Sequence, residues 1–299
     1  QDKLLRINTI NDKIFYYLCN KLRRKIKMSQ KKILYITQEI LPYLPETQIS
    51  TISRHLPQAI QEKGHEIRTF MPKYGNINER RNQLHEVIRL SGMNLIIDDT
   101  DHSLIIKVAS IQSARMQVYF IDNEDYFENR EILVDKDGKE YDDNDERSIF
   151  FIRGVMETIK KLRWVPDIIH CHGWFSALAP IYIKKGYKDD PCLKNAKVIY
   201  SVYDDKFEKS FKDGFAERLR FDTIGDIEVE EVAKRGEIDF VELNKLTIDY
   251  SDGVIYGSET IDPELDKHIK EKKIPHLAYT EDFEAKADQV EEFYNEIDR

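Results

Sequence analysis

Apolar residues recur along this chain with two different periods. A run of strand length at residues 31–37 is followed by residues 49–63, whose isoleucines and leucine recur at spacings of three and four. Gly64 stands where a helix ends on a left-handed residue, and residues 65–71 then alternate as a second strand. This order predicts a βαβ opening, with parallel strands joined by a right-handed crossover.

Residues 85–122 break this pattern, because three strand-like runs follow one another there without a helical period. They predict an antiparallel excursion. Afterwards helices and strands alternate. The predicted helices are 144–162, with N-cap chemistry at 142–144, and 174–185, 240–250, 263–272 and 281–297. The predicted strands are 167–171, 197–203, 253–256 and 276–279. Residues 204–238 are acidic and interrupted by glycines, which favours an irregular or partly helical surface insertion. The whole pattern predicts a doubly wound, mostly parallel Rossmann-like α/β sheet.

The first 27 residues differ from the rest of the chain. A short apolar run at residues 14–18 precedes a basic stretch at 21–27, which is the reverse of the order in a signal peptide. We expect residues 1–27 to be an extension and residues 28–299 to form one domain. The alternative is an amphipathic basic helix that lies on the surface of the domain.

The composition excludes several kinds of partner. A net charge of -9 argues against nucleic acid, because phosphate-backbone binding needs a basic surface. Cys19, Cys171 and Cys192 form no CxxC pair or Cys/His cluster, so we expect no metal site and a reducing, cytoplasmic environment. No apolar run approaches the roughly eighteen residues of a membrane span. The chain is expected to need no cofactor.

Ligands of an open α/β sheet gather beyond the carboxyl ends of its strands. The loop after the first strand, residues 38–48, contains no glycine and two prolines. It therefore matches neither nucleotide-binding glycine motif, and its prolines remove backbone donors that a phosphate would use. The residue types at this loop argue against a phosphate cradle.

Aromatic and polar side chains follow two other strands. His172 and Trp174 emerge together after residues 167–171, and an indole face suits a sugar ring. The alternative is that His172 caps the following helix while Trp174 packs in the core. Residues 119–127 place Tyr126 beside several carboxylates, and the alternative there is an acidic loop with Tyr126 packed beneath it.

Several segments together resemble the bacterial glycogen synthase and plant starch synthase family. The matching segments are collinear over residues 31–265, which makes the resemblance more specific than any single motif. They comprise residues 32–39 with Pro42, Leu56 with Pro57, 63–68, 71–75, 119–127, Asp143 and Asn144 with Arg147, Trp164 with 166–172, and 251–258.

The resemblance implies one half of a GT-B architecture, in which two Rossmann-like domains face each other. The family reaction transfers glucose from a nucleotide sugar such as ADP-glucose to an α-1,4-glucan, and the first domain holds mainly the glucan. The resemblance makes His172, which in the family contacts the transferred sugar, the candidate catalytic residue. It makes Trp174, Tyr126 and Asp143 candidate sugar-binding residues.

The chain departs from the family where the donor phosphates would lie. The family's Lys-x-Gly-Gly-Leu is replaced by Pro45, Glu46, Thr47 and Gln48 before Ile49. Its His-Asp-Trp corresponds to residues 172–174, where glycine stands in the middle, and its Thr-x-His-Asn corresponds to residues 201–204. Charge-assisted bonds contribute about 1.5–3 kcal/mol each, so these losses predict weak ADP-glucose binding.

The sequence also lacks a counterpart of the family's second, nucleotide-binding domain. We therefore expect impaired or absent transfer by this chain alone. A partner polypeptide with a nucleotide domain would be needed for activity. The alternatives are a non-catalytic glucan-binding or regulatory protein, and a subunit that docks on a full-length synthase.

Overall fold

The computed structural model describes residues 30–299, and the chain divides into the units Gln1–Lys31 and Lys32–Arg299. The predicted extension at residues 1–27, with its surface-helix alternative, lies outside the described residues. Within residues 30–299 no helix is long and apolar enough to cross a membrane.

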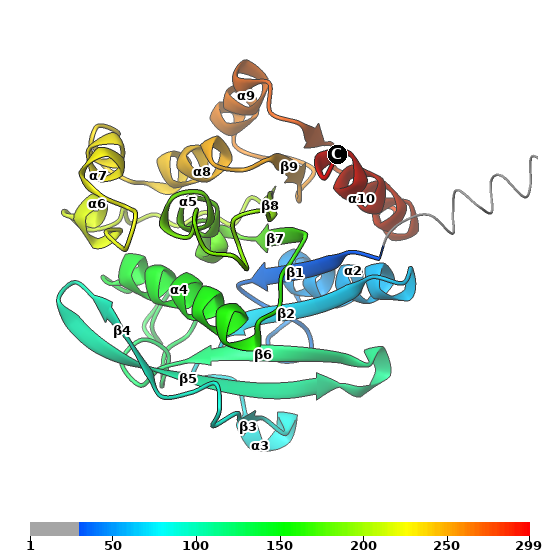
Figure 1. The fold of residues 1–299 in the computed structure, drawn as a ribbon, viewed down its shortest axis with the longest axis horizontal. Coiled ribbons are helices and arrows are strands. Elements are labelled where there is room, and N and C mark those ends of the chain that lie inside the picture. The colour runs from blue at the N-terminus through cyan, green and yellow to red at the C-terminus, as the bar shows by residue number, and fades with distance from the viewer. Residues whose placement is uncertain (1–29) are drawn as a thin grey trace, which may run out of the picture. The chain divides into compact units, whose positions relative to one another are not determined.

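The unit Lys32–Arg299 is built on a ten-stranded sheet (Figure 1). Its strand order is β10-β9-β8-β7-β1-β2-β6-β5-β3, with β4 also paired to β5. The strands are β1 (Lys32–Thr37), β2 (Glu66–Pro72), β3 (His85–Glu86), β4 (Met93–Ile97), β5 (Thr100–Ile111), β6 (Met116–Asp122), β7 (Ile168–His172), β8 (Lys197–Val202), β9 (Gly253–Tyr256) and β10 (His276–Leu277).

The antiparallel excursion is confirmed, and β5 is its centre. β5 pairs antiparallel with β3, β4 and β6, whereas β6 rejoins the parallel sheet beside β2. The central strand β1 is buried on both faces, as a covered parallel strand must be, while much of β5 alternates between buried and more exposed residues. The predicted doubly wound, mostly parallel sheet is therefore confirmed.

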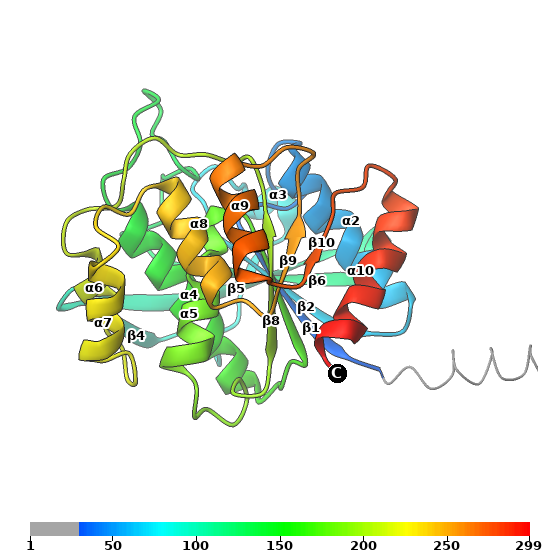
Figure 2. The same ribbon diagram turned by 90° about the horizontal axis from the view of Figure 1, so that it is seen from above.

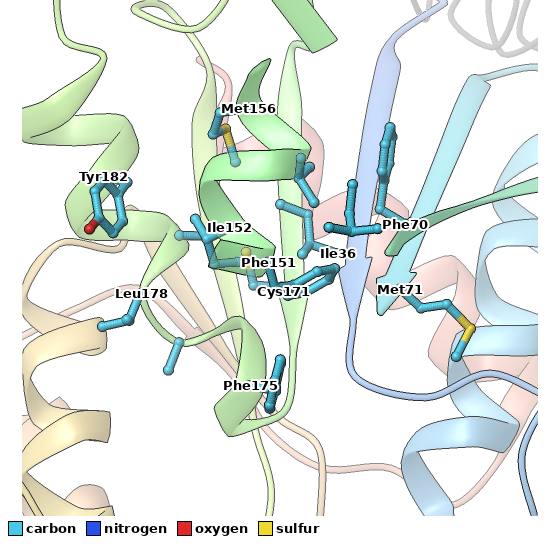
Figure 3. Close-up of a cluster of buried hydrophobic side chains, with 14 of the residues drawn as sticks. Ile36, Phe70, Met71, Phe151, Ile152, Met156, Cys171, Phe175, Leu178 and Tyr182 are labelled. Carbon is cyan, nitrogen blue, oxygen red and sulfur yellow. The ribbon is translucent and has the colours of Figure 1, made fainter. Parts of the chain in front are cut away.

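Helices cover both faces of the sheet (Figure 2). On one face α4 (Asn144–Leu162), α5 (Ala179–Ile181) and α8 (Phe240–Asp249) enclose the larger apolar core, and α9 (Pro263–Lys272) packs against α8. Figure 3 shows part of this core, where Phe151 and Ile152 of α4 lie beside Ile36 and Cys171 of the sheet.

The opposite face is covered by α2 (Gln48–Glu62) and α10 (Phe283–Ile297), which lie side by side. After β10 at the edge of the sheet, the chain crosses back so that α10 packs on the central strands. Its apolar residues recur at spacings of three and four and are buried with Ile33 and Tyr35 of β1. They are Ala287, Val290, Phe293 and Tyr294.

The predicted helix at 174–185 is wrong as a single helix. The chain forms a 3-10 turn at Trp174–Ser176, then α5, then a π-helical turn at Tyr182–Gly186. Pro180 lies in the first turn of α5, where its missing N–H is tolerated, so the helix restarts there. The insertion at 204–238 is partly helical as predicted, with α6 (Phe215–Arg218) and α7 (Asp226–Ala233); the short α3 (Glu79–Asn82) was not predicted.

Candidate active site

The candidate site lies at the carboxyl edge of the sheet, where the strand order reverses. β1 connects to β2 on one side, while β7, β8 and β9 continue on the other. Hydrogen bonds join the loops that follow these strands. The backbone N–H of Trp174 donates to Asp205 Oδ2 at 2.9 Å, and the N–H of Phe175 donates to Gln38 Oε1 at 3.3 Å. The loop after β9 is tied to α2, because Ser258 Oγ donates to Gln48 Oε1 at 2.7 Å.

His172, the candidate catalytic residue, is the last residue of β7 and is only 1% exposed. Its Nδ1 is hydrogen-bonded to the Tyr203 hydroxyl at 2.8 Å, and its Nε2 is buried without a hydrogen-bond partner in the described structure. Burial, together with the nearby positive charge of Lys286, lowers the pKa of His172 to about 3. The imidazole is therefore neutral at physiological pH, and it does not cap a helix.

The space beside His172 is small. A void of about 10 Å³ is lined by His172, Tyr203, Gly257 and Lys286, among others, and it has room for about one water molecule. Tyr203 is itself 3% exposed and lies so close to Gly257 that a Cβ there would be 2.4 Å from the tyrosine ring. The space beside the imidazole is therefore too small for a sugar ring in this structure.

Buried hydrogen bonds link further side chains on the face of the sheet that α10 covers. His170 binds Ser201 Oγ through Nε2 at 2.7 Å and the Tyr294 hydroxyl through Nδ1 at 2.6 Å. Tyr294 in turn meets the hydroxyl of Tyr35 at 3.0 Å. His170 therefore points into the packing between the sheet and the helices, and α10 supplies part of that packing through Tyr294.

Gly173 explains why this chain has no aspartate between His172 and Trp174. Its φ of 79° and ψ of 163° form a backbone conformation that glycine alone adopts readily, and a Cβ would lie 2.3 Å from Gln38 Oε1. The loop after β8 nevertheless brings a carboxylate to this turn, because Asp205 accepts the Trp174 N–H.

The sequence interpretation missed three polar residues of the site. Gln38, Glu39 and Asp205 come from loops that are distant in sequence, and only the pairing of β1, β7 and β8 brings them together. Burial raises the pKa of Asp205 to about 7 and also raises the pKa of Glu39. The rule that ligands gather at the ends of strands pointed to these loops but not to these side chains.

The structure places Trp174 and Tyr126 in the interior, each 2% exposed, where both pack against other side chains. Trp174 packs against Phe175, Phe207 and Phe211. The Tyr126 hydroxyl meets His102 Nε2 at 3.0 Å and donates to Glu146 at 3.3 Å. A sugar platform needs an exposed ring face, which neither residue offers here.

Asp143 is the N-cap residue of α4, but its side chain makes no capping hydrogen bond, so that part of the prediction is wrong. The carboxylate instead pairs with both ends of the Arg130 guanidinium. Burial acts to raise the pKa of Asp143, but the hydrogen bond and positive charge of Arg130 outweigh it and lower that pKa overall. Asp143 thus holds the loop before α4 rather than facing an open pocket.

Residues 45–48, the degenerate loop that replaces the family's Lys-x-Gly-Gly-Leu motif, lead into the start of α2. Thr47 caps α2 in a reciprocal capping box with Ser50. Glu46 is exposed, and Pro45 offers its carbonyl to Ser50 Oγ at 2.9 Å. Beside this loop lies a pocket of about 490 Å³, which α10 lines on the far side.

No group of three histidine, cysteine or acidic residues placed to hold a metal ion occurs among residues 30–299. The described cysteines, Cys171 and Cys192, are free thiols. Burial raises the pKa of Cys171, so its thiol is unreactive.

Comparison with curated proteins finds bacterial glycogen synthases. One from Chlorobium luteolum is 38% identical over 173 residues, which cover 58% of this chain and 35% of the relative. One from Chlorobaculum tepidum is 39% identical over 173 residues, with 58% and 36% covered. The chain thus matches about a third of the length of these relatives.

Among solved structures, the catalytic domain of starch synthase IV from Arabidopsis thaliana, bound to ADP and acarbose, superposes with a TM-score of 0.65. It is 18% identical, and the match covers 84% of this chain and 51% of that one. This likeness supports the fold, a Rossmann-like half of a GT-B glycosyltransferase. The family model of the starch synthase catalytic domain matches residues 32–277. The chain therefore belongs to the starch synthase catalytic domain family.

Proposed function

We propose that this domain binds α-1,4-glucan as a regulatory or binding member of its family, and that the polypeptide alone does not transfer glucose from ADP-glucose. The match to the starch synthase catalytic domain family supports glucan binding, and the enclosure of His172 supports the absence of transfer. Its ring is 1% exposed, is held by Tyr203, and faces a void for about one water molecule. Transfer needs the reacting sugar in contact with the residues that position it.

The degenerate loop supports the same conclusion. Glu46 stands beside the capped start of α2, so the loop itself places a carboxylate where a sugar diphosphate would need positive charge. A second polypeptide that supplied cations would be required for turnover. We expect the protein to act in a reducing cytoplasm, consistent with its free cysteines.

The test is an assay of labelled glucose incorporation from ADP-glucose into glycogen, run beside co-sedimentation with glycogen. We expect the protein to sediment with glycogen and to incorporate no label, while a full-length bacterial glycogen synthase incorporates it under the same conditions. Incorporation by the purified chain would overturn the proposal, and so would failure to sediment with glycogen.

A further inference from the structure

A cavity of about 630 Å³ lies in the insertion that follows β8. Residues 209–217 bound it on one side, and α7 with residues 236–238 bounds it on the other; α6 and α7 lie side by side there (Figure 1). All of its lining residues fall within 209–238, so the cavity is separate from the candidate active site. Its volume is in the range of small-molecule sites.

The inner wall of this cavity is apolar. α7 supplies Val229, Val232 and Ala233, whose spacings of three and four place them on one face of the helix. The opposite side supplies Phe211 and Phe215, whose ring centroids are 5.1 Å apart. Contact with this wall removes apolar ligand surface from water and is therefore favourable.

Two lysines also line the cavity, but each already has a counter-ion. Lys209 pairs with Asp142, and Lys212 pairs with Glu146 at 3.3 Å. Both carboxylates belong to the loop before α4 or to its first turn, so these ion pairs also fix residues 209–217 to the rest of the fold. A bound anion would have to compete with them, and the cavity exists without a ligand.

The acidic part of the lining is neutralised less fully. Asp213 and Glu237 are exposed and form no ion pair with any residue that the structure describes. Glu217 pairs with Arg220 at 2.9 Å. α7 also ends at the cavity, with Ala233, and the carbonyl end of a helix carries partial negative charge. The rim of the cavity therefore favours a cation, while its wall favours an apolar group.

We propose that this cavity binds an organic ammonium ion that carries an apolar body, such as an aromatic or long-chain amine. The hydrocarbon part lies against the two phenylalanines and the α7 face, and the ammonium group lies at the rim with Asp213 and Glu237. Solvent screens exposed carboxylates, so the wall supplies most of the affinity and the charges select a cation over neutral or anionic analogues. The inference concerns a second site and depends on neither glucan binding nor glucose transfer.

The experiment is a nuclear magnetic resonance titration of the purified protein with phenethylammonium. The amide signals of Gly214 and Gly236, which both line the cavity, report binding there. Phenethyl alcohol, phenylpropanoate and methylammonium are titrated beside it as the neutral analogue, the anionic analogue and the cation without an apolar body. We expect phenethylammonium to bind most tightly of the four.

Three variants test the two halves of the site. Asp213→Asn and Glu237→Gln should each weaken phenethylammonium binding by about two- to fivefold and leave the weaker binding of phenethyl alcohol unchanged. Ala233→Phe fills the cavity from an exposed position of α7 and should abolish the binding of both compounds. Glu271→Gln on α9 is the matched control, because that side chain is 65% exposed, and it should bind as wild type does.

Thermal unfolding should show that all four variants fold. If Ala233→Phe does not fold, the two carboxylate variants decide the outcome. The proposal is overturned if phenethylammonium does not bind, or if phenethyl alcohol or phenylpropanoate binds as tightly. It is also overturned if phenethylammonium binds to folded Ala233→Phe, or to both carboxylate variants, as it binds to wild type.

Discussion

Two cationic side chains on opposite faces of the sheet differ in how they are partnered. On the α4 face Arg147 is fully buried, yet its guanidinium donates to the carbonyl oxygens of Tyr126, Glu131 and Ile132 and to Asn144. On the α10 face Lys286 has no counter-ion among the described residues, and His172 Nε2 has no partner. The comparison teaches that the Arg147 guanidinium joins three backbone segments, whereas the Lys286 ammonium packs on the ring of Tyr279 and holds no such segments together.

Arg147→Met gives the sharpest test of the α4 face. Removing the guanidinium leaves three buried carbonyl groups and one amide without their donor, so we expect the free energy of unfolding to fall by about 3–5 kcal/mol. Urea unfolding measures it, with Lys267→Met as the exposed control. A loss below about 1 kcal/mol would show that this face does not depend on its buried cation.

Gly173→Ala tests the carboxyl edge where the two faces meet. The left-handed φ and the overlap with Gln38 should together lower the free energy of unfolding by about 2–4 kcal/mol. A Gln38→Ala change in the same protein should recover the part due to overlap and leave the backbone part. Equal unfolding curves for Gly173→Ala and wild type would remove the steric explanation for the missing aspartate.

Tyr294→Phe removes one hydroxyl from the buried chain on the α10 face. His170 Nδ1 and the Tyr35 hydroxyl each lose a partner, so we expect a loss of about 1–2 kcal/mol. Tyr182→Phe is the matched change on the α4 face, where a single bond of 3.2 Å to the Leu219 carbonyl is lost. If the two variants unfold alike in urea, the hydrogen-bonded chain is not cooperative.

Asp205 gives an effect of a different kind, a dependence of stability on pH. Its folded pKa of about 7 lies above the ordinary value of 3.8, so its contribution to stability is complete below about pH 4 and is lost as the pH rises through 7. Asp205→Asn keeps an oxygen for the Trp174 N–H and should flatten the decline of the melting temperature between pH 4 and 7. The pKa of Glu39 is raised in both proteins and leaves a residual slope. An unchanged slope would contradict the assignment.

Local patterns predicted the elements of this fold well. The ranges expected for β9 and α9 agree with Gly253–Tyr256 and Pro263–Lys272, because glycine and proline mark their starts. The helix predicted at 174–185 failed because Pro180 and two non-α turns interrupt a segment whose apolar residues are buried on all sides.

The site was harder to predict because it depends on burial and on long-range packing. A sequence does not show whether a tryptophan ring lies on the surface or in the core, and Trp174 lies in the core. The first loop contains no cation, as the sequence shows, but α10 brings Lys286 to it from more than two hundred residues away in the chain. No local pattern indicates that crossing.

The most direct test of the account is the nuclear magnetic resonance signal of the His172 ring nitrogens, assigned with a His172→Gln variant and followed between pH 5 and 8. Burial of His172, together with the nearby charge of Lys286, lowers its pKa to about 3, so we predict the signals of a neutral imidazole throughout this range. Signals of a protonated imidazole within this range would show that the ring is open to solvent and would contradict the account.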